Sequence, residues 1–307
     1  MGDDFVILSL VPMLVGVLAS TACALLGNFL VLRRQSLMGD AVSHVVLPGI
    51  VVAFLMTGSI AAGFMLAGAA AAAIVSVALI ELIRRAGRIE PGAAMGVVFT
   101  TMFAAGVLLL EQSDTSSVHL DVEHALYGNL ESLVWFGADG WRSLLSATAL
   151  ADLPPQLPRL ALMLIAVIGF LVLLWKELFI GTFDAAFAES IGARPHTIGF
   201  ALIIMVAAVA VTAFDAVGSI IVIAMFICPA AAARLMTDRL APQIAWSVGF
   251  AVLAAVLGYV LAAQGPLWLG ARSSVSAAGM IATVAGLILG IACLTGPRRL
   301  RTQAAAR

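Results

Sequence analysis

An acidic side chain and an imidazole lie four residues apart in an otherwise apolar stretch of this sequence, at Asp40 and His44. On an α-helix, positions i and i+4 lie above one another on the same face, so these two side chains would point together. Ionisable groups at membrane depth are costly and usually face a bundle interior or a water-filled path. A carboxylate with an imidazole is also a partial ligand set for a divalent transition metal. The pair therefore indicates a path for metal ions through a membrane.

A second interpretation of the pair stays open. Asp40 could cap the start of a helix, where the helix dipole favours negative charge, and pair with Arg33 or Arg34. His44 lies a full turn deeper and fits that interpretation less well. Pro48 follows four residues later, and because proline has no N–H, it leaves the backbone carbonyl of His44 without its helical partner.

The composition of the chain places these residues in a membrane protein. Apolar residues make up 63% of the 307 residues, charged residues make up 11%, and the mean hydropathy is +1.12. Soluble domains carry about 25% charged residues. Apolar runs of about 20 residues can each span a bilayer. About nine are present, at residues 5–32, 37–57, 60–83, 92–110, 159–176, 197–213, 217–236, 243–263 and 277–295. We predict an all-α polytopic membrane protein with a single transmembrane domain over residues 1–307.

The basic residues are distributed unevenly between the two sides of these spans. Of the 16 lysines and arginines, thirteen fall on one set of connections, and the opposite set holds only Arg142, Arg159 and Arg272. Since cytoplasmic connections carry the excess of positive charge, we expect the N-terminus outside and the C-terminus in the cytoplasm. The tail at residues 298–307 is expected to be disordered. The net charge of −1 gives no indication of a nucleic-acid partner.

The external connection at residues 111–158 is long enough to have a function. It contains Trp135 and Trp141. Its middle, from Val122 to Phe136, could form a short helix that rests at the membrane interface, where tryptophans are favoured. Four of its residues could collect metal ions, although solvated loop residues near a docking surface are the simpler interpretation: His119, Asp121, Glu123 and His124.

The cytoplasmic connection at residues 177–196 is predicted to contain a short helix. Thr182 or Asp184 could cap its start, Gly192 could end it, and Pro195 would stop it. Its apolar side would carry Phe183, Phe187, Ala188 and Ile191. A short amphipathic helix outside the bilayer suits docking into a groove on a soluble partner.

Three segments resemble the membrane permeases of ABC importers for manganese, zinc and iron. They are LRRQSLMGDAVSHVVLPG at residues 32–49, FDAAFAESIG at residues 183–192 and VGSIIVIAMFICPAAAARLM at residues 217–236. The external LDVEHALYGNLE at residues 120–131 resembles a family segment more loosely. The matches run from about residue 20 to 240 in the expected order and spacing.

The resemblance implies a type II importer-like permease in the bacterial cytoplasmic (inner) membrane. Its partners would be a second copy of the chain, an ATP-binding subunit and an extracytoplasmic metal-binding protein. Asp40 and His44 would handle the metal along the path. The positions that contact the ATPase would be Phe183, Asp184, Ala188 and Gly192. A structural signature would comprise Pro48, Pro229 and Arg234.

The metal ion in this interpretation is transported and is not a stably bound cofactor. Oxygen and imidazole ligands suit manganese and iron, and imidazole also suits zinc. Because no thiolate lies near Asp40, manganese is favoured, with iron and zinc as alternatives. We expect alternating access, in which closure of the ATPase subunits reorients the helices around the metal path.

The chain carries no sequence of its own for binding ATP. No GxxxxGK[ST] loop is present, so we expect a permease subunit that is not an enzyme, with ATP hydrolysed by a separate subunit. The alternative is a gradient-driven metal transporter or channel without an ATPase, which would not need the docking helix at residues 183–192. Asp215, near the outer end of the sixth span, could belong to an outer gate.

Overall fold

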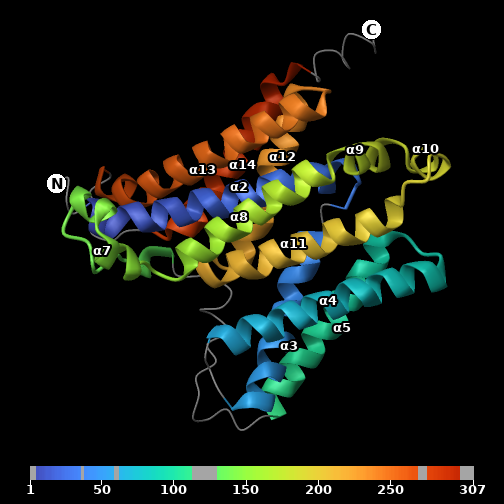
Figure 1. Ribbon diagram of the computed structural model, residues 1–307, viewed down its shortest axis with the longest axis horizontal. Coiled ribbons are helices and arrows are strands. Elements are labelled where there is room, and N and C mark those ends of the chain that lie inside the picture. The colour runs from blue at the N-terminus through green and yellow to red at the C-terminus, as the bar shows by residue number, and fades with distance from the viewer. Residues whose placement is uncertain (1–4, 36–37, 59–61, 113–129, 269–274, 298–307) are drawn as a thin grey trace.

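The computed structural model describes residues 5–35, 38–58, 62–112, 130–268 and 275–297. Every regular element within these ranges is helical (Figure 1). The long helices are α2 (Val11–Leu32), α3 (Met38–Thr57), α4 (Ala62–Gly87), α5 (Pro91–Gln112), α8 (Gln156–Leu173), α11 (Pro195–Val217), α12 (Ser219–Met236), α13 (Leu240–Trp268) and α14 (Ala277–Thr295). The short ones are η1 (Val6–Leu10), η2 (Leu130–Ser132), η3 (Trp141–Leu145), α7 (Ala147–Ala151), α9 (Trp175–Phe183) and α10 (Ala185–Ser190).

The helices agree with the predicted membrane spans. Seven of them are long and apolar enough to cross a bilayer, and α3 and α12 contain shorter apolar stretches at His44–Thr57 and Ile221–Met236. The main difference lies at the predicted span 159–176. There α8 ends at Leu173, and the separate helix α9 begins at Trp175. The chain is therefore an all-α multi-pass membrane protein.

The helices form two groups that α11 connects (Figure 1). In the first group, α2 packs against α12 and α13, α14 packs against α12 and α13, and α8 packs against α2. In the second group, α3 packs against both α4 and α5. Helix α11 contacts α2 and α8 on one side and α3 and α4 on the other. The chain passes from the first group to the second at the turn between α2 and α3.

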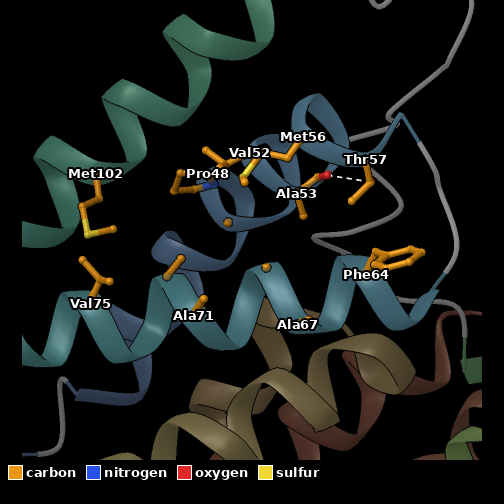
Figure 2. Close-up of a pocket in the computed structure, with 13 residues that line it drawn as sticks. Pro48, Val52, Ala53, Met56, Thr57, Phe64, Ala67, Ala71, Val75 and Met102 are labelled. Atoms are coloured by element: carbon orange, nitrogen blue, oxygen red, sulfur yellow. Dashed lines mark hydrogen bonds between the residues drawn. The ribbon is translucent and has the colours of Figure 1, made fainter.

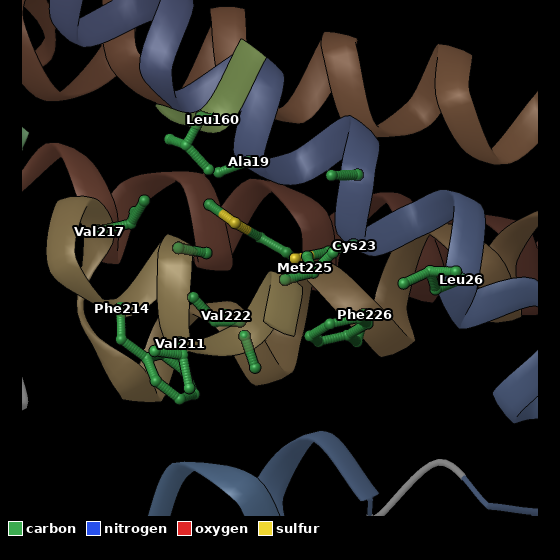
Figure 3. Close-up of a cluster of buried hydrophobic side chains, with 14 of the residues drawn as sticks. Ala19, Cys23, Leu26, Leu160, Val211, Phe214, Val217, Val222, Met225 and Phe226 are labelled. Carbon is green, nitrogen blue, oxygen red and sulfur yellow. The ribbon is translucent and has the colours of Figure 1, made fainter. Parts of the chain in front are cut away.

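The core of the first group combines large apolar side chains with small residues that let helix backbones approach. Figure 3 shows part of it, with side chains from α2, α8, α11 and α12 around Cys23 and Met225. At Gly27 of α2, an added Cβ would overlap the backbone carbonyl oxygen of Phe226 in α12. Such close backbone contact is typical of helix packing in membranes.

A buried polar cluster also holds the first group together. The Nδ2 of Asn28 in α2 donates to the Oγ of Ser247 in α13 at 2.6 Å, and the Nε2 of Gln243 donates to the Oδ1 of Asn28 at 3.0 Å. All three residues are buried. Polar side chains that pair across helices stabilise membrane bundles, typically by about 0.6 to 2 kcal/mol for each interaction.

Candidate functional site

The predicted metal-handling positions lie in the first turns of α3, the first helix of the second group. Asp40 and His44 both fall within its helical backbone, which keeps the four-residue spacing on which the prediction depends. The side chain of Asp40 lies outside the described residues. His44 is partly buried.

The imidazole of His44 is enclosed by two aromatic rings of α5. The ring of Phe99 stacks on it with a centroid distance of 5.1 Å and an interplanar angle of 21°. The ring of Phe103 meets it at 79° with a centroid distance of 5.5 Å. Stacked and edge-on aromatic contacts each stabilise a particular ring orientation. The two phenylalanines therefore orient the imidazole, a role that the sequence analysis did not assign to them.

Helix α3 is held against both of its neighbours at glycines. A Cβ at Gly106 of α5 would lie 2.7 Å from the Cβ of Pro48, and a Cβ at Gly49 would lie 2.5 Å from the carbonyl oxygen of Gly68 in α4. Pro48, one turn after His44, therefore packs directly on α5 and fixes how closely α3 approaches it. This contact gives the predicted signature proline a structural role.

A cavity of about 440 Å³ lies between α3, α4 and α5 (Figure 2). Its wall is almost entirely apolar and includes Val52, Met56, Phe64 and Met102. Such a wall offers no ligands that could replace the hydration shell of a divalent ion. The lining of this cavity therefore provides no ligand set for a divalent ion.

The described side chains form no tight metal cage. Among these side chains, which exclude that of Asp40, no group of three or more His, Cys, Asp or Glu residues could hold a metal ion. A path for transport needs binding that is weak enough for the ion to leave. The predicted external metal-collecting residues, His119, Asp121, Glu123 and His124, lie outside the described residues, as does the tail at residues 298–307.

Asp215 lies near the C-terminal end of α11 and has a basic partner. Its Oδ2 is 3.4 Å from the Nη1 of Arg159 in α8, and both side chains are partly exposed. Three residues further on, Gly218 has a φ of +87° and separates α11 from α12. The pair thus joins α8 to α11 close to the turn into α12, and Arg159 was not predicted from the sequence.

The predicted cytoplasmic helix is present as α10. Asp184 is its N-cap and accepts a hydrogen bond from the backbone N–H of Phe187 at 2.9 Å. Gly192, with a φ of +82°, follows its C-terminus, and the N–H groups of Gly192 and Ala193 donate to the carbonyls of Glu189 and Ala188, each at 3.0 Å. This is the Schellman arrangement, which favours glycine. The predicted caps are confirmed, and Asp184 caps α10 in preference to Thr182.

Large apolar side chains of α10 and its flanks face outward. Phe183, Phe187 and Ile191 are each more than half exposed, at 51%, 53% and 54%. Ala188, which was predicted to share this apolar side, is buried at 1% and so packs against the rest of the chain. Clustered exposed apolar side chains mark an interaction surface for a protein or a membrane.

The remaining signature residues lie toward the end of α12. Pro229 lies within the helix and is buried. Arg234 lies in the last turn, where its Nη1 donates to the backbone carbonyl of Asp238 at 3.4 Å. Arg234 therefore stabilises the turn between α12 and α13.

The predicted short helix over residues 122–136 lies mostly outside the described residues, and its described end contains the short helix η2. Trp135 is fully buried, and its Nε1 donates to the carbonyl of Ala149 at 2.9 Å. A buried indole is stable there because its one donor finds an acceptor inside the protein. Trp141 is 53% exposed. Glu131, which the sequence analysis did not single out, accepts a hydrogen bond from the N–H of Ala277 at the start of α14.

Comparison with known proteins matches this chain over most of its length. A model of the ABC 3 transport family matches residues 8–134 and 154–296. The manganese transport system membrane protein MntD of Bacillus subtilis is 36% identical over 298 residues, or 94% of each chain. The zinc transport system membrane protein TroD of Treponema pallidum is 37% identical over 286 residues, or 93% of this chain and 73% of TroD. A solved structure titled "PsaBC from Streptococcus pneumoniae in complex with Fab" matches with a TM-score of 0.74 and 25% identity, over 96% of this chain and 94% of that chain.

Proposed function

Because this chain belongs to the ABC 3 transport family, we propose that it is the membrane-spanning subunit of an ATP-driven importer of divalent transition-metal ions. Membership of this family makes the chain a permease subunit that is not itself an enzyme. The ATP would be hydrolysed by a separate ATP-binding subunit, and an extracytoplasmic binding protein would deliver the metal. Two copies of the permease would lie in the bacterial cytoplasmic membrane, with the N-terminus outside and the C-terminus in the cytoplasm.

The observation that carries the proposal is the surface of α10 and its flanks. This capped helix presents Phe183, Phe187 and Ile191 to the outside. Arg194 and Pro195, at the start of α11, follow directly, on a side of the membrane that the distribution of basic residues assigns to the cytoplasm. A gradient-driven transporter or channel needs no such docking element, so this surface favours a permease with an ATPase partner over that alternative.

The metal path would run beside α3, where Asp40 and His44 bind the ion transiently as substrate. Alternating access would reorient α3 and its neighbours, and the pair of Asp215 and Arg159 would form part of the outer gate. Manganese is the favoured ion because carboxylate and imidazole suit it without thiolates. The names of the relatives support manganese and zinc, and iron remains an alternative substrate because the same ligands suit it.

The test is manganese uptake by cells that express this chain with its ATP-binding subunit and its binding protein. We expect Asp40→Ala and His44→Ala each to lower ATP-dependent uptake of radioactive manganese by about tenfold or more, as loss of a metal-site residue commonly does. Gly169→Ala in α8 is the control, because nothing lies within 4 Å of the added Cβ. Competition with zinc and iron ranks the substrates.

Two results would contradict the proposal. Unchanged uptake in both variants, with the complex assembled, would make Asp40 and His44 a feature of the helix start only. Uptake that persists without the ATP-binding subunit would favour the gradient-driven alternative.

A further inference from the structure

Arg33 connects the end of α2 to α9, the helix that precedes α10. Its Nε donates to the Oγ1 of Thr182 at 3.0 Å, and that hydroxyl donates in turn to the carbonyl of Leu178 at 2.5 Å. Thr182 lies in the last turn of α9, two residues before Asp184, the N-cap of α10. One side chain thus joins the turn between α2 and α3 to the start of α10.

Two glycines provide the space that the guanidinium of Arg33 occupies. A Cβ at Gly199 in α11 would lie 2.9 Å from the Nη1 of Arg33, and a Cβ at Gly181 in α9 would lie 3.8 Å from its Nη2. Helices α9 and α11 precede and follow α10 in the chain, so Arg33 lies against the helix on each side of α10. Burial lowers the pKa of Arg33, but an arginine remains charged at any physiological pH.

The hydrogen bonds of this guanidinium are incomplete. Its Nη2 is buried and has no hydrogen-bond partner among the described residues, and the same holds for the Oε1 of Gln35. Both residues line a cavity of about 140 Å³, together with Glu81 and Arg84 at the end of α4. A buried donor without a partner is unfavourable. The guanidinium therefore has both space and a polar wall toward which it can move.

The described residues after Arg33 are held by backbone hydrogen bonds. The N–H groups of Arg34 and Gln35 donate to the carbonyls of Val31 and Leu30 at 3.2 and 2.8 Å. Arg34 has a φ of +57°, a conformation that this type of helix end usually assigns to glycine. The N–H of Met38, the first residue of α3, donates to the carbonyl of Gln35 at 3.0 Å. A displacement of Arg33 would therefore pass through this turn to the start of α3.

We propose that Arg33 is a positioning residue that transmits movement of α9 and α10 to α3. The inference rests on the proposed function, because it needs a partner that moves α10. When the ATPase displaces α10, Thr182 and the glycine-lined slot move the guanidinium, and the turn at Arg34 converts that movement into a tilt of α3. Because α3 carries His44, ATP hydrolysis would reach the metal path by this route.

The experiment measures manganese imported per ATP hydrolysed, in proteoliposomes that contain the complete complex and the manganese-loaded binding protein. Gly199→Ala displaces the guanidinium at little structural cost, because its Cβ meets only the end of a flexible side chain. Thr182→Val removes the hydroxyl that accepts the hydrogen bond from Arg33 and keeps the shape of the side chain. We expect either variant to assemble and to lower the manganese-to-ATP ratio by roughly three- to tenfold, the size expected for changes along a coupled network.

Matched controls separate this role from general damage. Gly169→Ala adds a methyl group in α8 where nothing lies within 4 Å, and Thr182→Ser keeps the hydroxyl. Both should retain the wild-type ratio. Wild-type ratios in Gly199→Ala and Thr182→Val would overturn the proposal, and so would loss of the assembled complex in these variants, which would make the contact structural. Failure of the proposed function is distinct, because the wild-type complex would then import no manganese with ATP.

Discussion

At the residue scale, the described side chains with proposed roles are held mostly by aromatic rings, glycines and hydroxyls. His44 lies between two phenylalanines, and Arg33 lies between two glycines beside a threonine. Such neighbours help to fix the orientation of an ionisable side chain. A metal ion that binds His44 then meets an imidazole whose orientation is already set, so less side-chain entropy is lost on binding.

A prediction at this scale concerns Phe99. Replacing it with leucine removes the stacked contact with His44, worth about 0.5 to 1.5 kcal/mol, and keeps most of the buried volume. We expect manganese uptake at low metal concentration to fall by about two- to tenfold, with the protein still assembled. Phe64→Leu is the control, because Phe64 is 53% exposed at the rim of the apolar cavity (Figure 2). Equal uptake by both variants would contradict an orienting role for Phe99.

At the element scale, the close contacts of α2 and the exposed surface of α10 serve opposite purposes. Helix α2 meets α12 through the backbone at Gly27 and pairs with α13 through Asn28. These contacts leave little freedom for one helix to slide on the other. Helix α10 is short and local, and it packs inward chiefly through Ala188. The fixed helices therefore form a frame, and α10 is available to a partner.

The close packing of α2 on α12 can be tested at Gly27. A methyl group there would overlap the backbone of α12, and overpacking of this kind costs typically about 1 to 3 kcal/mol. We expect Gly27→Ala to lower the melting temperature of the purified protein in detergent. Gly249→Ala in α13 is the control, since nothing lies within 4 Å of its Cβ. If the two variants melt at the same temperature, α2 and α12 do not pack as closely as described.

The availability of α10 can be tested at Phe187. Because this side chain is 53% exposed, Phe187→Ser should leave the melting temperature of the isolated permease unchanged. The same change should remove an apolar anchor of the proposed ATPase interface, where such residues can carry about 2 kcal/mol or more of binding free energy. The measurement is recovery of the ATP-binding subunit with tagged permease. Phe136→Ser, at an 82% exposed position on the external segment, should recover the subunit in full.

At the scale of the whole molecule, two helix groups are joined by α11 and by the turn that contains Arg33. The segment between α5 and α8 is tied to the first group, because the N–H of Trp135 donates to the carbonyl of Ile7 at 3.1 Å and Glu131 accepts a hydrogen bond from the N–H of Ala277 in α14. The second group packs on the rest of the chain mainly through α11. The contacts with α11 therefore largely determine how α3, α4 and α5 are placed against the first group.

The ion pair between α8 and α11 provides a prediction at this scale. Arg159→Asp would place two carboxylates together, and because the pair is partly exposed, the effect should not exceed about 1 kcal/mol, or fivefold. We expect lower manganese uptake that the added change Asp215→Arg restores. High salt should reduce the difference between the single variant and wild type. A double variant that transports no better than the single one would remove the pair from the outer gate.

Much of the architecture and part of the site could be predicted from local sequence. The helix positions follow from apolar runs, because a bilayer requires each spanning segment to satisfy its own backbone. The caps of α10 depend on neighbours within a few residues, so the sequence identified Gly192 and narrowed the N-cap to Thr182 or Asp184, of which the structure shows Asp184. The resemblance to metal-importer permeases rested on short motifs and is confirmed by the match to the ABC 3 transport family.

Other features depended on which helices lie side by side. Trp135 with Ala149, Glu131 with Ala277, Arg33 with Thr182 and His44 with Phe99 are pairs whose members lie between 14 and 149 residues apart. Hydropathy cannot identify such pairs, because in a membrane a lipid tail is as apolar as a neighbouring helix. The sequence therefore shows where the chain crosses the bilayer and which short motifs it carries. Packing at glycines and a few polar contacts establish which helices meet, and so which residues surround His44 and Arg33.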